Sequence, residues 1–171
     1  MTGDKSSTEK QVVGVGVHPV TPHLVCAGAA DAIAFYKKAF GAIEMMVLPG
    51  PDGRIMHACL SINGSSVMLA DKFPEMGNRS PKALNGTPVT IHLVVDDVDK
   101  FAEAAISAGG KVVMPVADMF WGDRYGVLED PFGHRWSVAT HKRQVSESEL
   151  REAARAAMAS RNCHSDQSDA Q

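Results

Sequence analysis

The sequence lacks the features that mark several large classes of protein. Lys and Arg total 17 against 20 Asp and Glu, and no basic stripe occurs, so we expect no nucleic-acid partner. No apolar run approaches the roughly 20 residues that a membrane-spanning helix needs. Residues 1–11 also lack the apolar core of a signal peptide. We therefore expect a protein that does not enter a membrane.

Cysteine is scarce as well. The three cysteines, Cys26, Cys59 and Cys163, are odd in number and have no metal-type spacing. This usage favours a reducing compartment, and we expect a cytoplasmic protein. Cys26 and Cys59 lie in apolar strand patterns, which favours buried structural thiols over catalytic ones. The motifs of a P-loop, a dinucleotide site and a serine nucleophile elbow are also absent from the sequence.

What the sequence does contain is an internal repeat. Residues 20–25, VTPHLV, return as residues 89–94, VTIHLV, with five of six residues identical. The same shift carries three glycines of the first copy onto glycines of the second: Gly41 onto Gly110, Gly53 onto Gly122, and Gly64 onto Gly133. A constant shift without a gap indicates two copies of one supersecondary unit. The seam between two packed copies is a common position for a ligand.

Hydrophobic periodicity predicts the same order of elements in each copy, a strand, a helix and three further strands. In unit one, residues 18–71, we expect a strand at 23–27, a helix at 31–40, and strands at 43–48, 54–62 and 66–71. In unit two, residues 89–142, we expect a strand at 89–95, a helix at 96–108, and strands at 111–116, 125–129 and 135–140.

The remaining segments predict a linker, one more helix and two tails. Residues 72–88 are rich in Pro and Gly and read as the linker between the units. Residues 144–159 predict a C-terminal helix that begins after Ser146 as N-cap. Residues 1–16 and 160–171 predict disordered tails. We therefore expect one α+β domain over residues 17–143, in which two tandem βαβββ units form paired, cupped, mixed sheets.

Two stretches resemble the vicinal oxygen chelate superfamily, which includes glyoxalase I, extradiol dioxygenases, and the fosfomycin and bleomycin resistance proteins. Residues 32–36, AIAFY, followed by Gly41 and Ala42, look like its first helix. Residues 130–134, DPFGH, look like its last hairpin. Residues 119–126 and 136–141 are similar to its PhnB-like branch, and the resemblance covers about residues 18–143.

This resemblance implies a cupped ligand site and, in metal-binding members, a divalent cation that polarises the substrate. Its ligands come from the first and last strands of each unit. On the motif alignment these positions fall on Thr21, Met68, Thr90 and Ser137. None is a histidine or a carboxylate, and hydroxyl and thioether groups are poor ligands for such cations. We therefore expect a glyoxalase- or bleomycin-resistance-like protein that binds a small molecule with no metal or other cofactor.

An alternative assignment keeps the metal. His23 and His92 lie two residues beyond the two threonines, so a strand register shifted by two would place both histidines at the ligand positions. Asp71 would then be the nearest carboxylate. The protein would be a metal-dependent lyase, isomerase or dioxygenase with a divalent ion such as Zn, Ni or Mn. The competing interpretation is a pair of half-buried histidines near the seam.

Several other side chains are candidates for a ligand cavity. His57 is a candidate acid or base, or a core histidine. Residues 120–125 combine aromatic and charged groups, which suits either a flat anionic ligand or a surface turn. The predicted cavity wall comprises Trp121, Arg124, Tyr125, His57, Thr21, Thr90 and Ser137. Either Trp136 or Ser137 faces the cavity, but not both. Because relatives commonly pair or swap units, we also expect a homodimer.

Overall fold

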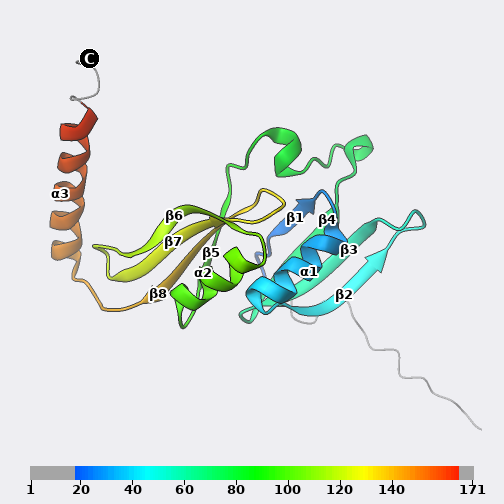
Figure 1. Cartoon of the computed structure of the whole chain (residues 1–171), viewed down its shortest axis with the longest axis horizontal. Helices are drawn as coiled ribbons and strands as arrows, with labels where there is room; N and C mark the ends of the chain where they lie inside the picture. Colours follow the sequence, from blue (N-terminus) through cyan, green and yellow to red (C-terminus); the bar gives the residue numbers. More distant parts are fainter. Residues whose placement is uncertain (1–17, 166–171) are drawn as a thin grey trace, which may run out of the picture.

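The computed structural model describes residues 18–165 and contains two βαβββ units in tandem (Figure 1). Unit one comprises β1 (His23–Cys26), α1 (Ala29–Phe40), β2 (Ile43–Pro49), β3 (Ile55–Ile62) and β4 (Ser65–Asp71). Unit two comprises β5 (Thr90–Val94), α2 (Val98–Ser107), β6 (Lys111–Asp118), β7 (Asp123–Glu129) and β8 (Arg135–His141). The linker carries two short 3₁₀ helices, Pro74–Met76 and Pro81–Leu84. The expected fold class is confirmed.

Each unit forms its own four-stranded mixed sheet. The strand orders are β1-β4-β3-β2 and β5-β8-β7-β6, with the first and last strands of each unit paired in parallel and the other neighbours antiparallel. The two sheets have the same register. His23 lies opposite Met68 in unit one, and His92 lies opposite Ser137 in unit two. The repeat in the sequence is therefore a repeat in space.

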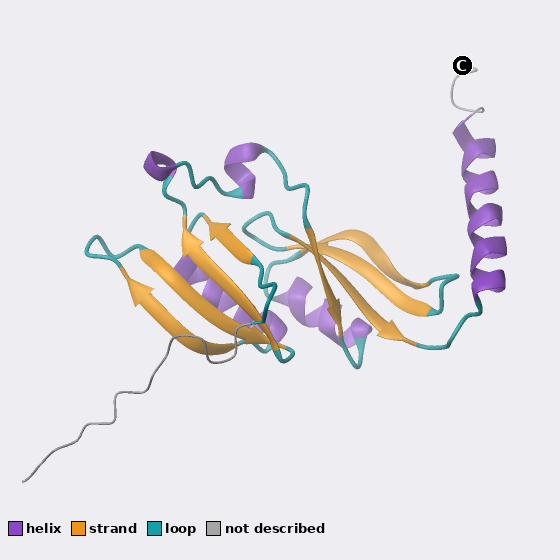
Figure 2. Ribbon diagram, turned by 180° about the vertical axis from the view of Figure 1, so that it is seen from behind, coloured by secondary structure: helices purple, strands orange, loops and turns teal. Residues whose placement is uncertain are grey.

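The helices cover only one face of each sheet. In Figure 1, α1 and α2 lie in front of their sheets, and in the reverse view of Figure 2 the strands lie in front of both helices. Alternation along the strands separates the two faces. Val67 and Leu69 on β4 are buried toward the helices, whereas Met68 between them points to the other side. Both uncovered faces look in the same direction, and we call them the open faces.

The last strand of each unit fixes the start of that unit's helix. Asp71 accepts hydrogen bonds from the backbone amides of Gly28 and Ala29 at the start of α1, at 3.2 and 2.8 Å. Thr140, which the repeat places at the position of Asp71, accepts one from the amide of Val98 at the start of α2, at 2.9 Å. These groups satisfy amides that have no partner within the helix.

The two units are joined by an aromatic core formed by side chains of both helices and of β8. Phe40 of α1 stacks on Phe101 of α2 with ring centres 4.9 Å apart, and it meets Trp136 of β8 edge-on at the same separation. Trp136 is fully buried, so of the two neighbours on β8 it faces the helix layer and Ser137 faces the open side. Burying rings of this size is a large part of the apolar gain in a small core.

The chain ends in α3 (Glu147–Ser165), which leads away from the second sheet (Figure 1). Ser146 caps it as expected, because its hydroxyl accepts a hydrogen bond from the amide of Glu149. The helix continues to Ser165, past the predicted end at Ala159. The rest of the two predicted tails, residues 1–16 and 166–171, lies outside the described residues. Within the part that is described, no helix is long and apolar enough to span a bilayer.

Candidate functional site on the open faces

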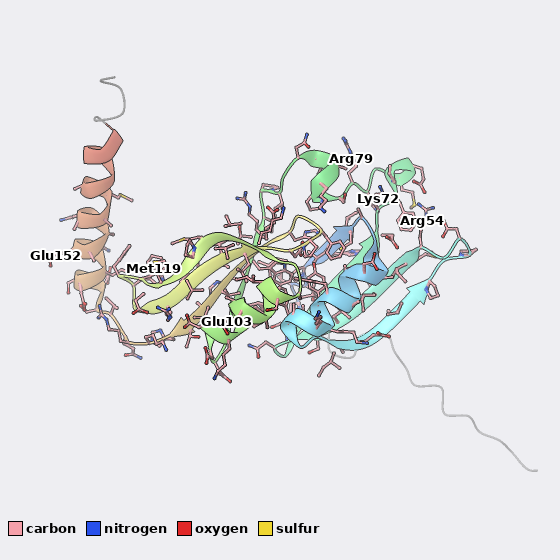
Figure 3. The ribbon with its side chains drawn as sticks, viewed as in Figure 1. Arg54, Lys72, Arg79, Glu103, Met119 and Glu152 are labelled. Atoms are coloured by element: carbon pink, nitrogen blue, oxygen red, sulfur yellow. The ribbon has the colours of Figure 1, made fainter. Side chains whose placement is uncertain are left out.

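A row of rings crosses the open face of unit two. The ring of His92 on β5 lies nearly parallel to that of Tyr125 on β7, with centres 6.2 Å apart. Tyr125 meets Trp121 edge-on at 5.5 Å, and Trp121 meets Phe120 edge-on at 5.0 Å. Such separations lie within the range of favourable aromatic pairs. The rings of β5, β7 and the loop before β7 therefore form one continuous aromatic surface. Met119, labelled in Figure 3, marks the loop end of this surface.

One polar pair is built into the aromatic surface. Nδ1 of His92 and Oγ of Ser137 are 2.8 Å apart, across the parallel pairing of β5 and β8. Ser137 is buried, whereas His92 is exposed. The hydrogen bond fixes the orientation of the imidazole and leaves its outer edge available to a ligand. The structure thus brings together three predicted or alternative site residues, Trp121, Tyr125 and Ser137, with His92.

Arg124 is not available to a ligand in the way the sequence suggested. Its Nε and Nη2 donate to the two carboxylate oxygens of Asp99 on α2, at 2.6 and 2.7 Å, and its Nη1 donates to Asp118 at 3.2 Å. Asp99, and then Asp118, raise the pKa of Arg124 further above its usual value. The guanidinium therefore ties α2 to the sheet, in the bidentate geometry that arginine favours.

Neither of the two threonines named as first-strand positions belongs to the row of rings. Thr21 precedes β1, and its hydroxyl donates to the carbonyl oxygen of His18 at 2.9 Å. Thr90 is the exposed first residue of β5 and lies opposite Arg135 at the edge of the pairing with β8. The residues that face the last-strand positions are instead His23 and His92, as the shifted register requires.

The shifted register does not assemble a divalent site within the described residues. The partners of the two histidines, Met68 and Ser137, supply no carboxylate. Asp71 uses Oδ1 for the amides of Gly28 and Ala29 and Oδ2 for the amide of Ile55. Nowhere in residues 18–159 do three His, Cys, Asp or Glu side chains come together as a metal site. The side chains present do not fit the divalent cation that the family implies.

His57 lies on the open face of unit one, half-buried on β3. Its ring meets that of His23 edge-on with centres 5.6 Å apart. Burial and the neighbouring His57 lower the pKa of His23 below its usual value, so His23 is neutral at pH 7. The sequence did not predict this histidine pair, because β1 and β3 are separated by β4 in the sheet and the contact depends on both rings leaning over that strand.

The two described cysteines are buried thiols without a disulfide. Burial raises the pKa of Cys26 to about 12 and also raises the pKa of Cys59. Thiols in this state are weak nucleophiles.

A hollow of about 340 Å³ lies at the seam where β1, the linker and the start of β5 meet. It is lined mainly by apolar side chains, including Leu24, Pro81 and Ile91. Arg79, labelled in Figure 3, lies on its linker side. Of the predicted site residues, only His23 reaches this hollow. The aromatic surface of unit two lies elsewhere, so the seam and the rings are separate features.

The sequence suggested His92 either as a metal ligand or as a half-buried histidine near the seam, whereas its main contacts in the structure are with Tyr125 and Ser137. The signal was present in the repeat. Residues on neighbouring strands that share a row must face the same side, and the repeat relates His92 and Ser137 to His23 and Met68. The stacking on Tyr125 required the register of β7 as well.

Comparison with known proteins agrees with this architecture. A family model described as the Glyoxalase/Bleomycin resistance protein/Dioxygenase superfamily matches residues 16–138. Uncharacterized protein Rv0887c of Mycobacterium tuberculosis is 48% identical over 155 residues, covering 88% of this chain and 91% of the relative. The crystal structure of protein PA1353 from Pseudomonas aeruginosa superposes with a TM-score of 0.59 at 26% identity, covering 72% of this chain and 98% of that one.

The PhnB protein of Bacillus cereus, at 17% identity and a TM-score of 0.54, covers 72% of this chain and 94% of its own, and shows the shared fold. The duplicated βαβββ units, the first helix and the last hairpin therefore have one common explanation. The chain belongs to the glyoxalase/bleomycin resistance protein/dioxygenase superfamily.

Proposed function

We propose that this protein binds a small organic molecule with a flat ring system on the open face of unit two, without a divalent metal. The observation that carries the proposal is the continuous row of rings from His92 through Tyr125 and Trp121 to Phe120. The open face of unit two is the side of its sheet that no helix covers (Figure 2).

The chemistry of this surface suits a flat ligand better than a charged one. Each aromatic contact adds about 1 kcal/mol beyond the burial of apolar area. Arg124, the guanidinium that the sequence assigned to the cavity wall, is held by Asp99 and Asp118. The row of rings also offers a polar group, the imidazole of His92, which Ser137 orients at 2.8 Å. A stacked ring with one hydrogen-bonding group at its edge matches this set of partners.

The residues at the last-strand positions of the two sheets support binding without a divalent cation. Met68 and Ser137 stand at the last-strand positions, and both oxygens of Asp71 accept backbone amides. Neither a thioether nor a serine hydroxyl is a favourable ligand for Zn, Ni or Mn. The protein therefore holds its ligand by stacking and shape.

We also propose that a second copy of the chain completes the site. The open faces carry exposed apolar side chains, such as Val94 and Leu48 at 59% and 51% exposure. A sheet with one uncovered apolar face is stabilised when another layer covers it. Two free thiols, Cys26 and Cys59, are consistent with our proposal of a cytoplasmic location.

Calorimetric titration with proflavine, a flat tricyclic cation, tests the proposal. Dicyclohexylamine is the matched probe, because it is a cation with two non-planar rings. We expect proflavine to bind more tightly, and Tyr125→Ala or Trp121→Ala to weaken it about tenfold, the equivalent of one stacking contact. Ile106→Ala removes an exposed apolar side chain from α2 and should leave the affinity unchanged.

Equal affinity for the two probes, or unchanged proflavine binding in both ring variants, would contradict the stacking site.

A separate experiment tests whether ligand binding requires a divalent metal. Treatment with EDTA should leave proflavine affinity unchanged. Stoichiometric Zn, Ni or Mn that is lost in His23→Ala or His92→Ala would instead support the metal-dependent lyase, isomerase or dioxygenase.

A further inference from the structure

A row of nitrogen and sulfur donors crosses the open face of unit one. His23 on β1 lies opposite Met68 on β4. Met68 in turn lies opposite Cys59 on β3, and Cys59 lies opposite Met46 on β2. Side chains directly opposite each other share a face, with Cβ atoms about 5 Å apart. The row therefore places an imidazole, a thioether, a thiol and a second thioether side by side.

A second imidazole joins this row from β3. The rings of His57 and His23 approach each other over β4, with centres 5.6 Å apart. A metal–nitrogen bond of about 2 Å allows two imidazoles that share one ion to have centres at most roughly 6 Å apart. The observed separation is within this limit. Met68 stands on β4, the strand over which the two rings meet.

We propose that His23, His57 and Met68 bind one monovalent soft cation of the Cu(I) type. Imidazole nitrogen and thioether sulfur are neutral donors, and soft sulfur ligands favour Cu(I) over harder ions. Three donors are sufficient for a three-coordinate ion. The step is coordination alone, and no electron transfer is involved. Cys59, the next donor in the row, lies opposite Met68 on β3 and is only 5% exposed.

The same residues disfavour a divalent ion. The carboxylate at the end of β4, Asp71, is engaged by the backbone amides of Ala29 and Ile55 at 2.8 Å each. No triad of His, Cys, Asp and Glu forms among the side chains that the structure describes, and the third donor proposed here is a methionine.

Unit two provides an internal comparison, because it has the same fold but no methionine or cysteine at the positions of Met68 and Cys59. His92 lies opposite Ser137, and Ser137 lies opposite Val127 on β7. His92 therefore occupies the position of His23 in a row that has no neighbouring thioether or thiol. The proposed ion belongs to unit one alone, and it is independent of the ligand surface proposed for unit two.

Anaerobic titration with Cu(I) in competition with bicinchoninate tests this site. The full chain is used with Cys163→Ser, so that this third thiol contributes nothing. We expect one Cu(I) per chain and a preference for Cu(I) over Zn(II). His23→Ala, His57→Ala and Met68→Leu should each lower the affinity at least tenfold, since even outer partners of metal ligands contribute 10- to 100-fold.

His92→Ala is the matched control and should bind Cu(I) like the parent chain. X-ray absorption should show nitrogen and sulfur neighbours, with the sulfur lost in Met68→Leu. Circular dichroism of the metal-free variants separates loss of a ligand from loss of the fold. Unchanged affinity in His57→Ala and Met68→Leu would overturn the proposal. Loss of binding in Cys59→Ser alone would also overturn it, because a single thiol would then hold the ion.

Discussion

At the scale of single residues, the most consequential side chain is the buried carboxylate of Asp130. Its Oδ2 accepts hydrogen bonds from the hydroxyl of Tyr36 at 2.6 Å and from Nε1 of Trp136 at 2.9 Å. Its Oδ1 accepts the amides of Phe132 and His134, each at 2.9 Å. Tyr36 belongs to unit one and Asp130 to unit two. Of the four hydrogen bonds to this carboxylate, the one from Tyr36 therefore forms only when the two units are docked.

Replacing Tyr36 with Phe removes one donor from this carboxylate and leaves the ring in place. Burial, and then the nearby Asp130, raise the pKa of Tyr36 well above its usual value, so the hydroxyl stays protonated and donates. A hydrogen bond to a buried charged group contributes about 2 kcal/mol. We expect Tyr36→Phe to lower the free energy of unfolding by that amount in urea denaturation.

Tyr125→Phe is the control for that variant. It makes the same chemical change on the open face, where the side chain is only half-buried. We expect its unfolding free energy to stay within about 0.5 kcal/mol of the parent. A loss of similar size in both variants would show that the contact between the units is no stronger than a surface hydrogen bond.

At the scale of elements, the repeat gives two equivalent turns with different surroundings. Gly53 and Gly122 precede β3 and β7, and both have positive φ, +81° and +97°. At Gly53 an added Cβ would meet nothing within 4 Å. At Gly122 it would collide with the carbonyl oxygen of Arg143, because the chain after β8 crosses this turn. The carbonyl oxygen of Gly122 also accepts hydrogen bonds from the backbone amides of Lys142 and Arg143, at 3.0 and 3.1 Å.

This pair separates backbone strain from steric collision. We expect Gly53→Ala to cost about 1 kcal/mol of unfolding free energy, from the left-handed conformation alone. Gly122→Ala carries the same strain plus the collision, so we expect a loss of more than about 2 kcal/mol. Thermal denaturation of the two variants side by side measures the difference. Equal losses would mean that the segment after β8 moves away from the turn at little cost.

Most elements were predictable, because their signals are local. The hairpin at Asn63 and Gly64 has positive φ at both residues, as the dipeptide predicts. The end of α3 was not, since the polar residues beyond Ala159 predicted a tail and the helix continues to Ser165. Polar composition argues against a packed core, but it does not prevent a helix whose residues have adequate helical propensity.

At the scale of the whole molecule, both open faces look to the same side (Figure 2). Both also carry exposed apolar side chains. The linker and the aromatic core hold the units in this arrangement, because Phe40 contacts Phe101 and Trp136 across the boundary. Covering both faces at once requires a second layer of comparable size. A second copy of the chain presents such a layer, which is the physical reason to expect a symmetric dimer.

Sedimentation equilibrium should therefore give twice the chain mass of 18.2 kDa at micromolar concentration. Val94→Lys introduces a charge on the open face of unit two and should weaken the dimer at least tenfold, since burying an unpaired charge at a contact is strongly unfavourable. Ile106→Lys makes the same kind of change on α2, where 45% of the side chain is exposed, and should leave the dimer intact. A monomeric parent chain, or a dimer disrupted by Ile106→Lys alone, would contradict this assembly.

The sequence alone determined the duplication, the order of the elements and the family resemblance. Those features depend on residue spacing, on turn-forming residues such as Gly64 and Gly133, and on short motifs, all of which act over a few residues. Tertiary structure decided which candidate side chains are free. Arg124 is engaged by Asp99, 25 positions before it in the chain. Asp71 is engaged by backbone amides at the start of α1 and of β3. The register of β5 and β8 places His92 opposite Ser137, 45 positions further along the chain. No local sequence pattern specifies a partner at that distance.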